Sequence, residues 1–271
     1  MLKFLVALIL LVIPFTASAQ SQDISIDGEH GKLSAVLQTP DGQKNYPLVI
    51  ICHGFTANKE HLLLTNLSDE LEARGIASIR FDFNGHGKSD GDFQDMTVLN
   101  EIEDAKKVYD YASKLSLVTS ISIAGHSQGG VVASMVAGEL GAKKIKAVVL
   151  MAPAAVLRDD SIRGNLFGTK YDSLNPPEYV EIFGGHKVGR NYILTAQTLP
   201  IYETAEKFTG PALMIHGTGD VIVPYTYSLS YKKNYKNSKV ELLDGVNHSF
   251  VGEEKRTAKI AADFFATQLK K

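Results

Sequence analysis

The stretch SISIAGHSQGGVVASMVAG, residues 120–138, joins a β-rich run to a helix-like run through a turn of glycine and polar residues. Its centre, GHSQG at residues 125–129, matches the pattern G-x-S-x-G. The pattern alone is common, but a strand before it and a helix after it are the context in which such a serine is exposed as a nucleophile. The alternative is that Ser127 is only a turn residue that caps the following helix.

The two glycines of this turn have a steric role. In a sharp strand-to-helix turn, the residues two before and two after the serine approach each other closely and must be small, which Gly125 and Gly129 satisfy. The Ser127 hydroxyl would then lie at the N-terminus of the helix, where developing negative charge is favoured. We therefore predict that Ser127 is a nucleophile.

The rest of the chain repeats this alternation of apolar runs and helical segments. Buried strands of this kind, separated by helices, are typical of a parallel sheet covered on both faces. We therefore predict an α/β fold with a mostly parallel, doubly wound sheet. The predicted strands cover residues 47–52, 76–83, 120–125, 146–152, 211–217 and 239–243, and the predicted helices cover residues 60–74, 98–115, 128–140, 225–235 and 254–270.

One connection is much longer than the others. Nearly sixty residues, rich in glycine, tyrosine and phenylalanine, separate the strand that ends near Ala152 from the strand that begins at Pro211. A structureless loop of that length is uncommon inside a compact domain. We predict an inserted cap over about residues 154–205, within one domain that covers residues 20–271.

The first nineteen residues read as a targeting segment. A basic start at Lys3 is followed by an apolar run over residues 4–15 and by the small-residue site ASA at residues 17–19. The run is shorter than the roughly 20 residues that span a bilayer, so a cleaved signal peptide over residues 1–19 is the better interpretation. We expect an exported protein, periplasmic or secreted, with no stable membrane anchor after cleavage.

Composition and failed motifs exclude several classes of function. The chain has 28 Lys and Arg against 30 Asp and Glu, a net charge of −2, and no block of like charges, so nucleic acid is not an expected partner. The stretch FNGHGKSDG, residues 83–91, meets neither the phosphate-loop nor the dinucleotide pattern, and no cluster has zinc-ligand spacing. The single cysteine, Cys52, lies in an apolar run. We expect no metal and no cofactor, and no pattern indicates an oligomeric state.

A serine hydroxyl needs a base to take its proton and a carboxylate to orient that base. In this architecture the expected order along the chain is serine, acid, histidine. Asp220 follows a strand in HGTGDVIVP, and His248 follows the last strand in LLDGVNHSF. We predict Ser127, Asp220 and His248 as a catalytic triad.

Other histidines and acids fit these roles less well. His126 is adjacent to Ser127 and would point away from it, and His216 at a strand end is read as structural. Asp244 belongs to an Asp-Gly pair, which is a common turn. For the oxyanion, the backbone N–H of Gln128 is one expected donor, and the second is expected from the loop HGFTANKE, at Phe55.

From about Gly31 to the C-terminus, the chain resembles the α/β-hydrolase superfamily and, within it, the bacterial cinnamoyl or feruloyl esterases. The resemblance rests on HGFTANKEH, RFDFNGHGKSDG, GHSQGGVVAS, LMAPAA, LPIYETAEKFTGPALMIHGTGD and GVNHSF. It implies the same triad, with Phe55 and Gln128 as backbone donors, and a cap that covers the active site.

The resemblance also implies a substrate, an ester of an aryl-propenoic acid such as ferulate, p-coumarate or caffeate, free or in the plant cell wall. In similar enzymes an acidic residue early in the insertion and a tyrosine late in it meet the phenolic hydroxyl, and the matching positions are Asp160 and Tyr192. Some relatives carry a glutamine at the position of Phe167. From the residues themselves, the aromatic side chains of the cap could stack on a flat ring or could form the cap's own small core.

The sequence thus predicts a secreted serine esterase that hydrolyses hydroxycinnamate esters through an acyl-enzyme. Two alternatives stay open. The triad does not separate ester from amide cleavage, so a general carboxylesterase or an aminopeptidase-like hydrolase of the same fold is possible. A non-catalytic protein that binds aromatic or glycan ligands is the alternative from another class.

Overall fold

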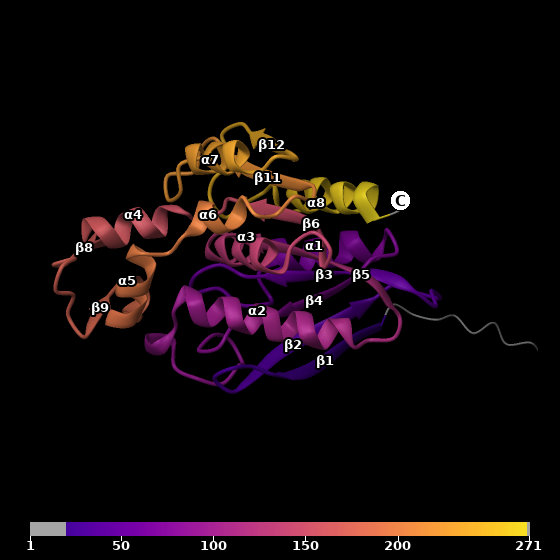
Figure 1. The fold of residues 1–271 in the computed structure, drawn as a ribbon, viewed down its shortest axis with the longest axis horizontal. Helices are drawn as coiled ribbons and strands as arrows, with labels where there is room; N and C mark the ends of the chain where they lie inside the picture. The colour runs from indigo at the N-terminus through magenta and orange to yellow at the C-terminus, as the bar shows by residue number, and fades with distance from the viewer. Residues whose placement is uncertain (1–19, 270–271) are drawn as a thin grey trace, which may run out of the picture.

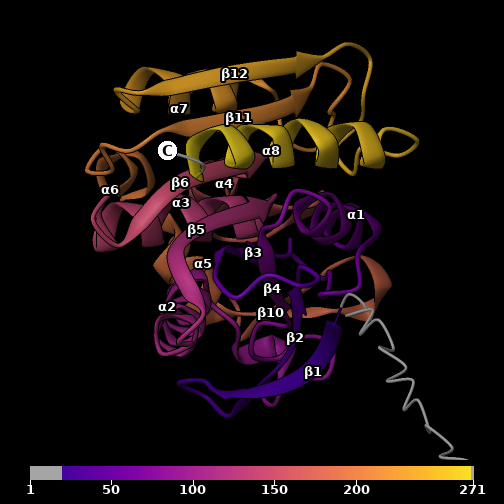
Figure 2. The ribbon, with the colours of Figure 1, turned by 90° about the vertical axis from the view of Figure 1, so that its right-hand side faces the viewer.

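The central feature of the fold is an eight-stranded sheet, seen in a computed structural model that describes residues 20–269. The strand order is β1-β2-β4-β3-β5-β6-β11-β12, and Figure 2 shows it running from β12 at the top to β1 at the bottom. The strands are β1 (Gln20–Asp27), β2 (Lys32–Thr39), β3 (Tyr46–Cys52), β4 (Ala77–Phe81), β5 (Val118–His126), β6 (Ile145–Met151), β11 (Ala212–Gly217) and β12 (Ser238–Leu243).

The strands from β4 to β12 pair in parallel, whereas β1 and β2 pair in antiparallel fashion at one edge. The predicted class, an α/β-hydrolase fold with a mostly parallel sheet, is confirmed. The predicted strand over residues 76–83 is shorter in the structure, Ala77–Phe81. The carboxylate of the next residue, Asp82, accepts hydrogen bonds from Lys59.

Helices cover both faces of the sheet. One face carries α1 and α8, which pack on each other, and the other carries α2, α3, α6 and α7. In Figure 2, α8 crosses in front of β6 and β11. The helices of the two layers are α1 (Leu62–Glu72), α2 (Val98–Ser113), α3 (Gln128–Leu140), α6 (Ile201–Ala205), α7 (Thr226–Asn234) and α8 (Glu254–Leu269).

The alternation of side chains along the buried strands divides the core in two. On β3, Ile50 and Cys52 face the α2 and α3 layer, while Val49 and Ile51 face α1 and α8. All four are fully buried, and burial of one such aliphatic side chain contributes about 1.5–3 kcal/mol. This two-sided burial explains why the central strands are nearly continuous apolar runs in the sequence.

The connection between β6 and β11 is structured. Figure 1 shows α4, α5, β8 and β9 gathered at one end of the molecule, beyond the sheet. We call residues 154–205 the cap segment. Its last helix, α6, lies directly on α3, since a Cβ atom at Gly138 would be 2.0 Å from the Thr204 oxygen. The remaining elements are α4 (Val156–Arg163), β7 (Asn165–Leu166), β8 (Thr169–Lys170), β9 (Tyr179–Glu181), β10 (Lys187–Gly189), α5 (Arg190–Gln197) and the short 3₁₀ helices η1 (Phe93–Asp95) and η2 (Phe183–Gly185).

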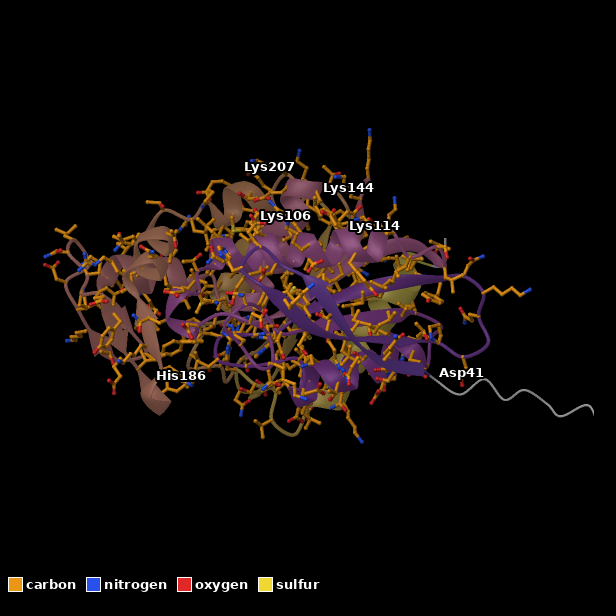
Figure 3. The ribbon with its side chains drawn as sticks, turned by 90° about the horizontal axis from the view of Figure 1, so that it is seen from below. Asp41, Lys106, Lys114, Lys144, His186 and Lys207 are labelled. Atoms are coloured by element: carbon orange, nitrogen blue, oxygen red, sulfur yellow. The ribbon has the colours of Figure 1, made fainter. Side chains whose placement is uncertain are left out.

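Charged side chains cover the outside of this fold. Figure 3 labels His186 at the cap end and four lysines along another side of the molecule. One of them, Lys106, pairs with Glu103 at 2.7 Å and with Glu139 at 2.8 Å, so acidic groups accompany the basic ones there. Over residues 20–269 no helix combines the length and the apolar character that crossing a membrane requires. The predicted signal peptide, residues 1–19, lies outside the described residues.

Candidate active site

Ser127 lies in the turn between β5 and α3, with a strained backbone at φ 54° and ψ −122°. The flanking glycines make this turn possible. A Cβ atom at Gly125 would be 2.0 Å from the Gly129 oxygen, and one at Gly129 would be 2.2 Å from the His53 oxygen. The Ser127 side chain makes no capping hydrogen bond to α3, so the capping alternative for Ser127 does not hold.

The close approach at Gly125 predicts a large effect of one added methyl group. We expect Gly125→Ala to destabilise the fold by about 3 kcal/mol or more, because the methyl group meets backbone rather than a flexible side chain. Gly141→Ala is the matched control, since its Cβ atom has open space around it and only its φ of 74° is strained, which costs about 1 kcal/mol. Urea denaturation of both variants measures the difference, and equal losses would contradict the steric explanation.

The structure brings the three predicted triad residues together. His248, in the loop after β12, has its Nε2 atom 2.9 Å from Ser127 Oγ and its Nδ1 atom 2.6 Å from Asp220 Oδ2. Because a carboxylate accepts, Nδ1 carries the proton and Nε2 is free to accept from the Ser127 hydroxyl. This is the arrangement in which an imidazole can take a proton from serine.

Asp220 is held in place by four hydrogen bonds. Its Oδ1 atom accepts from the backbone N–H groups of Ile222 at 2.9 Å and Val223 at 2.8 Å, and its Oδ2 atom accepts from His248 and from His216 Nε2 at 3.1 Å. Burial opposes ionisation of this carboxyl, but the hydrogen bonds from His216 and His248 outweigh it and hold the pKa of Asp220 well below its usual range. Asp220 is therefore an ionised, oriented partner for His248.

Two histidines outside the triad hydrogen-bond to its members. His216 shares the Asp220 Oδ2 atom with His248, and its Nδ1 atom is 2.7 Å from Ser228 Oγ. The Nε2 atom of His126 donates to the backbone oxygen of His248 at 3.0 Å. The positions of both residues at strand ends were the available signal, but their partners lie in other loops.

The buried position of His126 predicts a loss of stability in acid. Burial lowers the pKa of His126 to about 3, and the unfolded chain binds this proton near pH 6.5. The contribution of the neutral His126 side chain to the free energy of unfolding is therefore complete above about pH 6.5. It falls as the pH drops toward 3, and about 2 kcal/mol of it is lost at pH 5. His53, whose pKa burial also lowers to about 3, acts in the same direction.

Urea unfolding at pH 8 and pH 5 measures this dependence. The variant His126→Gln, whose amide can still donate to the His248 oxygen, is expected to lose less stability between these pH values than the wild type. If His126→Gln loses as much unfolding free energy between pH 8 and pH 5 as the wild type does, groups other than His126 cause the loss.

Two backbone segments adjoin Ser127, namely the start of α3 at Gln128 and the loop after β3. Gln128 is the first residue of α3, so its N–H has no partner within the helix. The loop after β3, which carries Phe55, touches the nucleophile, since a Cβ atom at Gly54 would be 3.0 Å from Ser127 Cβ. The same loop is fixed by the buried Lys59, whose backbone N and Nζ both donate to Asp82 at 2.7 Å.

A cavity of about 780 Å³ opens above Ser127 and His248, between the sheet and the cap segment. Aromatic rings line it: Phe55 lies 5.2 Å from Phe167 and 5.8 Å from Tyr192, measured between ring centroids. Phe167 is half exposed and has a left-handed backbone, with φ 49°. The cavity is large enough for a flat aromatic acyl group.

The two residues suggested for substrate contacts both line this cavity. Asp160, on α4, is partly buried, and burial raises its pKa although Arg163 lies 3.8 Å away. Tyr192, on α5, is buried, and burial raises its pKa too. The Tyr192 hydroxyl donates to the side-chain oxygen of Gln128 at 2.8 Å, a contact that the sequence did not suggest.

No group of three or more His, Cys, Asp or Glu residues within the described part of the chain is arranged to hold a metal ion. Cys52 is a buried free thiol, as its apolar neighbours suggested, and burial raises its pKa well above the usual range.

Several known proteins are similar to this chain in sequence or structure. A family described as serine aminopeptidase, S33, matches residues 43–173. The structure of Est1E from Butyrivibrio proteoclasticus with ferulic acid bound is 36% identical, with a TM-score of 0.88, over 92% of this chain and 100% of that chain. A putative hydrolase from Agrobacterium vitis S4, 21% identical with a TM-score of 0.73 over 91% of this chain and 98% of that one, shows the same fold.

Curated relatives match over shorter regions. An uncharacterized 31.7 kDa protein of Escherichia coli, from the traX-finO intergenic region, is 31% identical over 36% of this chain. The quorum-quenching protein AidA of Acinetobacter baumannii is 29% identical over 40% of it. These alignments span only 35% and 36% of the lengths of the two relatives. From its site and from its likeness to Est1E over the whole of that chain, this chain belongs to the α/β-hydrolase superfamily of serine hydrolases and, within it, resembles the cinnamoyl and feruloyl esterases.

Proposed function

We propose that the protein is an esterase that releases hydroxycinnamic acids, such as ferulic, p-coumaric or caffeic acid, from their esters. The observation that carries the proposal is the 2.9 Å contact between Ser127 Oγ and His248 Nε2 at the floor of an aromatic-lined cavity. The similarity to Est1E, a protein solved with ferulic acid bound, supports the choice of acyl group.

In the first half of the reaction, Ser127 Oγ attacks the ester carbonyl while His248 Nε2 takes its proton. The ionised Asp220 stabilises the imidazolium that forms. The backbone N–H groups of Phe55 and Gln128 donate to the oxyanion, and one such donor contributes about 2.7–4 kcal/mol to transition-state stabilisation. The tetrahedral intermediate collapses when His248 protonates the departing alcohol, which leaves an acyl-enzyme on Ser127.

In the second half, water replaces the alcohol. His248 takes a proton from the water, the hydroxide attacks the acyl-enzyme carbonyl, and the same two N–H groups stabilise the second oxyanion. Proton return from His248 to Ser127 Oγ releases the free acid. Every step uses residues of this chain and water.

The acyl group enters the cavity beneath the cap segment. Its flat ring packs against the stacked pair of Phe55 and Phe167, whose rings are 5.2 Å apart with an angle of 27° between their planes. Asp160 and Tyr192 meet the phenolic hydroxyl at the far end. Asp160 accepts the phenol proton there when it is ionised.

A second candidate function comes from the family description, serine aminopeptidase, since the same triad cleaves amides. Hydrolysis of methyl ferulate, 4-nitrophenyl acetate and an aminoacyl 4-nitroanilide by one enzyme preparation separates the candidates. We expect the highest kcat/KM with methyl ferulate. Preference for the acetate would make the protein a general carboxylesterase, and preference for the anilide would make it an aminopeptidase.

A fluorophosphonate probe tests the proposal that the site is catalytic at all. We expect it to label the wild type and not Ser127→Ala. An unlabelled wild type that still binds ferulate would identify a non-catalytic binding protein.

We also propose that the chain is exported, with residues 1–19 removed as a signal peptide. Mass spectrometry of the protein from a bacterial periplasmic extract would then show an N-terminus near Gln20. An intact Met1 in the cytoplasmic fraction would contradict export.

A further inference from the structure

A buried chain of hydrogen bonds, which triad chemistry does not use, adjoins the cavity. Its members are Glu101 on α2, Gln128 on α3 and Tyr192 on α5, which are 2%, 2% and 3% exposed. Gln128 Nε2 donates to Glu101 Oε2 at 2.9 Å, and the Tyr192 hydroxyl donates to Gln128 Oε1 at 2.8 Å. The chain connects the cap segment to the residue that follows the nucleophile.

The orientation of the Gln128 amide is fixed from two sides. Its Nε2 atom faces Glu101 Oε2 and also lies 3.6 Å from Met96 Sδ. A thioether accepts but has no proton to donate, so the Met96 side favours the amide nitrogen over the amide oxygen. Burial raises the pKa of Glu101 well above its usual range, but a neutral carboxyl still has a carbonyl oxygen that accepts. The amide oxygen therefore faces Tyr192.

This orientation determines what Tyr192 can offer to a ligand. A tyrosine hydroxyl has one proton, and here that proton is donated to Gln128. Toward the cavity, only the lone pairs of the Tyr192 oxygen remain. Asp160, which lines the same cavity, also presents acceptor oxygens when it is ionised. The part of the cavity that Asp160 and Tyr192 line is therefore an acceptor site.

We propose that Glu101 is a positioning residue that, through the Gln128 amide, keeps Tyr192 as an acceptor, so that the cavity selects acyl groups with a phenolic hydroxyl over their O-methyl ethers. This inference rests on the proposed function of ester hydrolysis. A phenol donates to the acceptor site. An aryl ether has no proton to donate and places an oxygen against other acceptors, and a site built to bind a hydroxyl rejects an analogue that lacks its hydrogen bond.

The test compares kcat/KM for methyl 4-hydroxycinnamate, methyl 4-methoxycinnamate and methyl cinnamate. The wild type is expected to prefer the hydroxyl ester over the methoxy ester by about tenfold or more. Glu101→Gln keeps an acceptor oxygen, so its preference should stay within about threefold of the wild type. Glu101→Met is similar in length but has only a weak acceptor, so its preference should fall toward one. The bulk of the methoxy group is the same for every variant, so the change in preference reports the hydrogen bonds.

Five results would overturn the inference. A wild type that hydrolyses the hydroxyl and methoxy esters equally well contradicts it, and so does a folded Glu101→Met variant that keeps the wild-type preference. If Glu101→Met lowers kcat/KM by the same factor for all three esters, Glu101 has only a structural role. If Glu101→Met does not fold, Gln128→Met decides instead, since it removes the amide but keeps the backbone N–H; an unchanged preference overturns the inference. Absence of turnover with all three esters would overturn the proposed function and this inference together.

Discussion

Ser127→Ala is expected to lower kcat/KM for ester hydrolysis by about 10⁵- to 10⁶-fold, and His248→Ala by a similar factor. The two side chains act as one unit across their 2.9 Å contact, so the double variant should be no slower than either single one. The remaining rate comes from the oxyanion donors and from binding. Initial rates with methyl ferulate measure the loss, provided that enzyme concentrations are high enough to detect the residual activity.

The control for Ser127→Ala is Ser113→Ala, which removes an exposed hydroxyl near the end of α2. That variant should keep wild-type kinetics. Thermal unfolding should show that all the variants remain folded. If Ser127→Ala retained more than about one hundredth of the activity, another nucleophile would be at work, since serine removal in a triad costs far more.

The central sheet could be predicted from the sequence because its strands are buried on both faces. Apolar runs such as residues 47–52 and 211–217 leave little ambiguity, and they correspond to β3 and β11. The edge strand β1 was not predicted. Residues 20–27 contain only two apolar side chains, Ile24 and Ile26, and their strand structure depends on antiparallel pairing with β2.

The candidate site also has residues that could be predicted from the sequence and residues that could not. Ser127, Asp220 and His248 could be predicted because chain order and strand ends restrict where a triad can form. The contact between Glu101 and Gln128 could not, since a glutamate within an amphipathic helix normally faces solvent. Its burial against a residue 27 positions away follows from the packing of α2 on α3. The same holds for His216, whose bond to Asp220 depends on the path of one loop.

Asp220→Asn is expected to lower kcat by about 10⁴-fold while KM changes little. In the wild type, Oδ1 accepts from two backbone N–H groups and Oδ2 accepts from His216 and His248. An asparagine has only one acceptor oxygen. If that oxygen keeps the two backbone N–H groups, the new NH₂ group faces His248 Nδ1, which must then give up its proton and accept. The proton moves to Nε2, and His248 can no longer take the proton of Ser127.

The matched control is Asp244→Asn, an acid in the turn after the neighbouring strand β12 whose contact is an exposed hydrogen bond from Thr218 at 3.1 Å. Its kcat should stay within about twofold of the wild type, because an exposed pair contributes little. If kcat falls for Asp244→Asn and not for Asp220→Asn, then Asp244 is the carboxylate that orients His248. A fall for Asp220→Asn that appears only in KM would mean that Asp220 shapes the cavity through Ile222 and Val223 rather than setting the tautomer of His248.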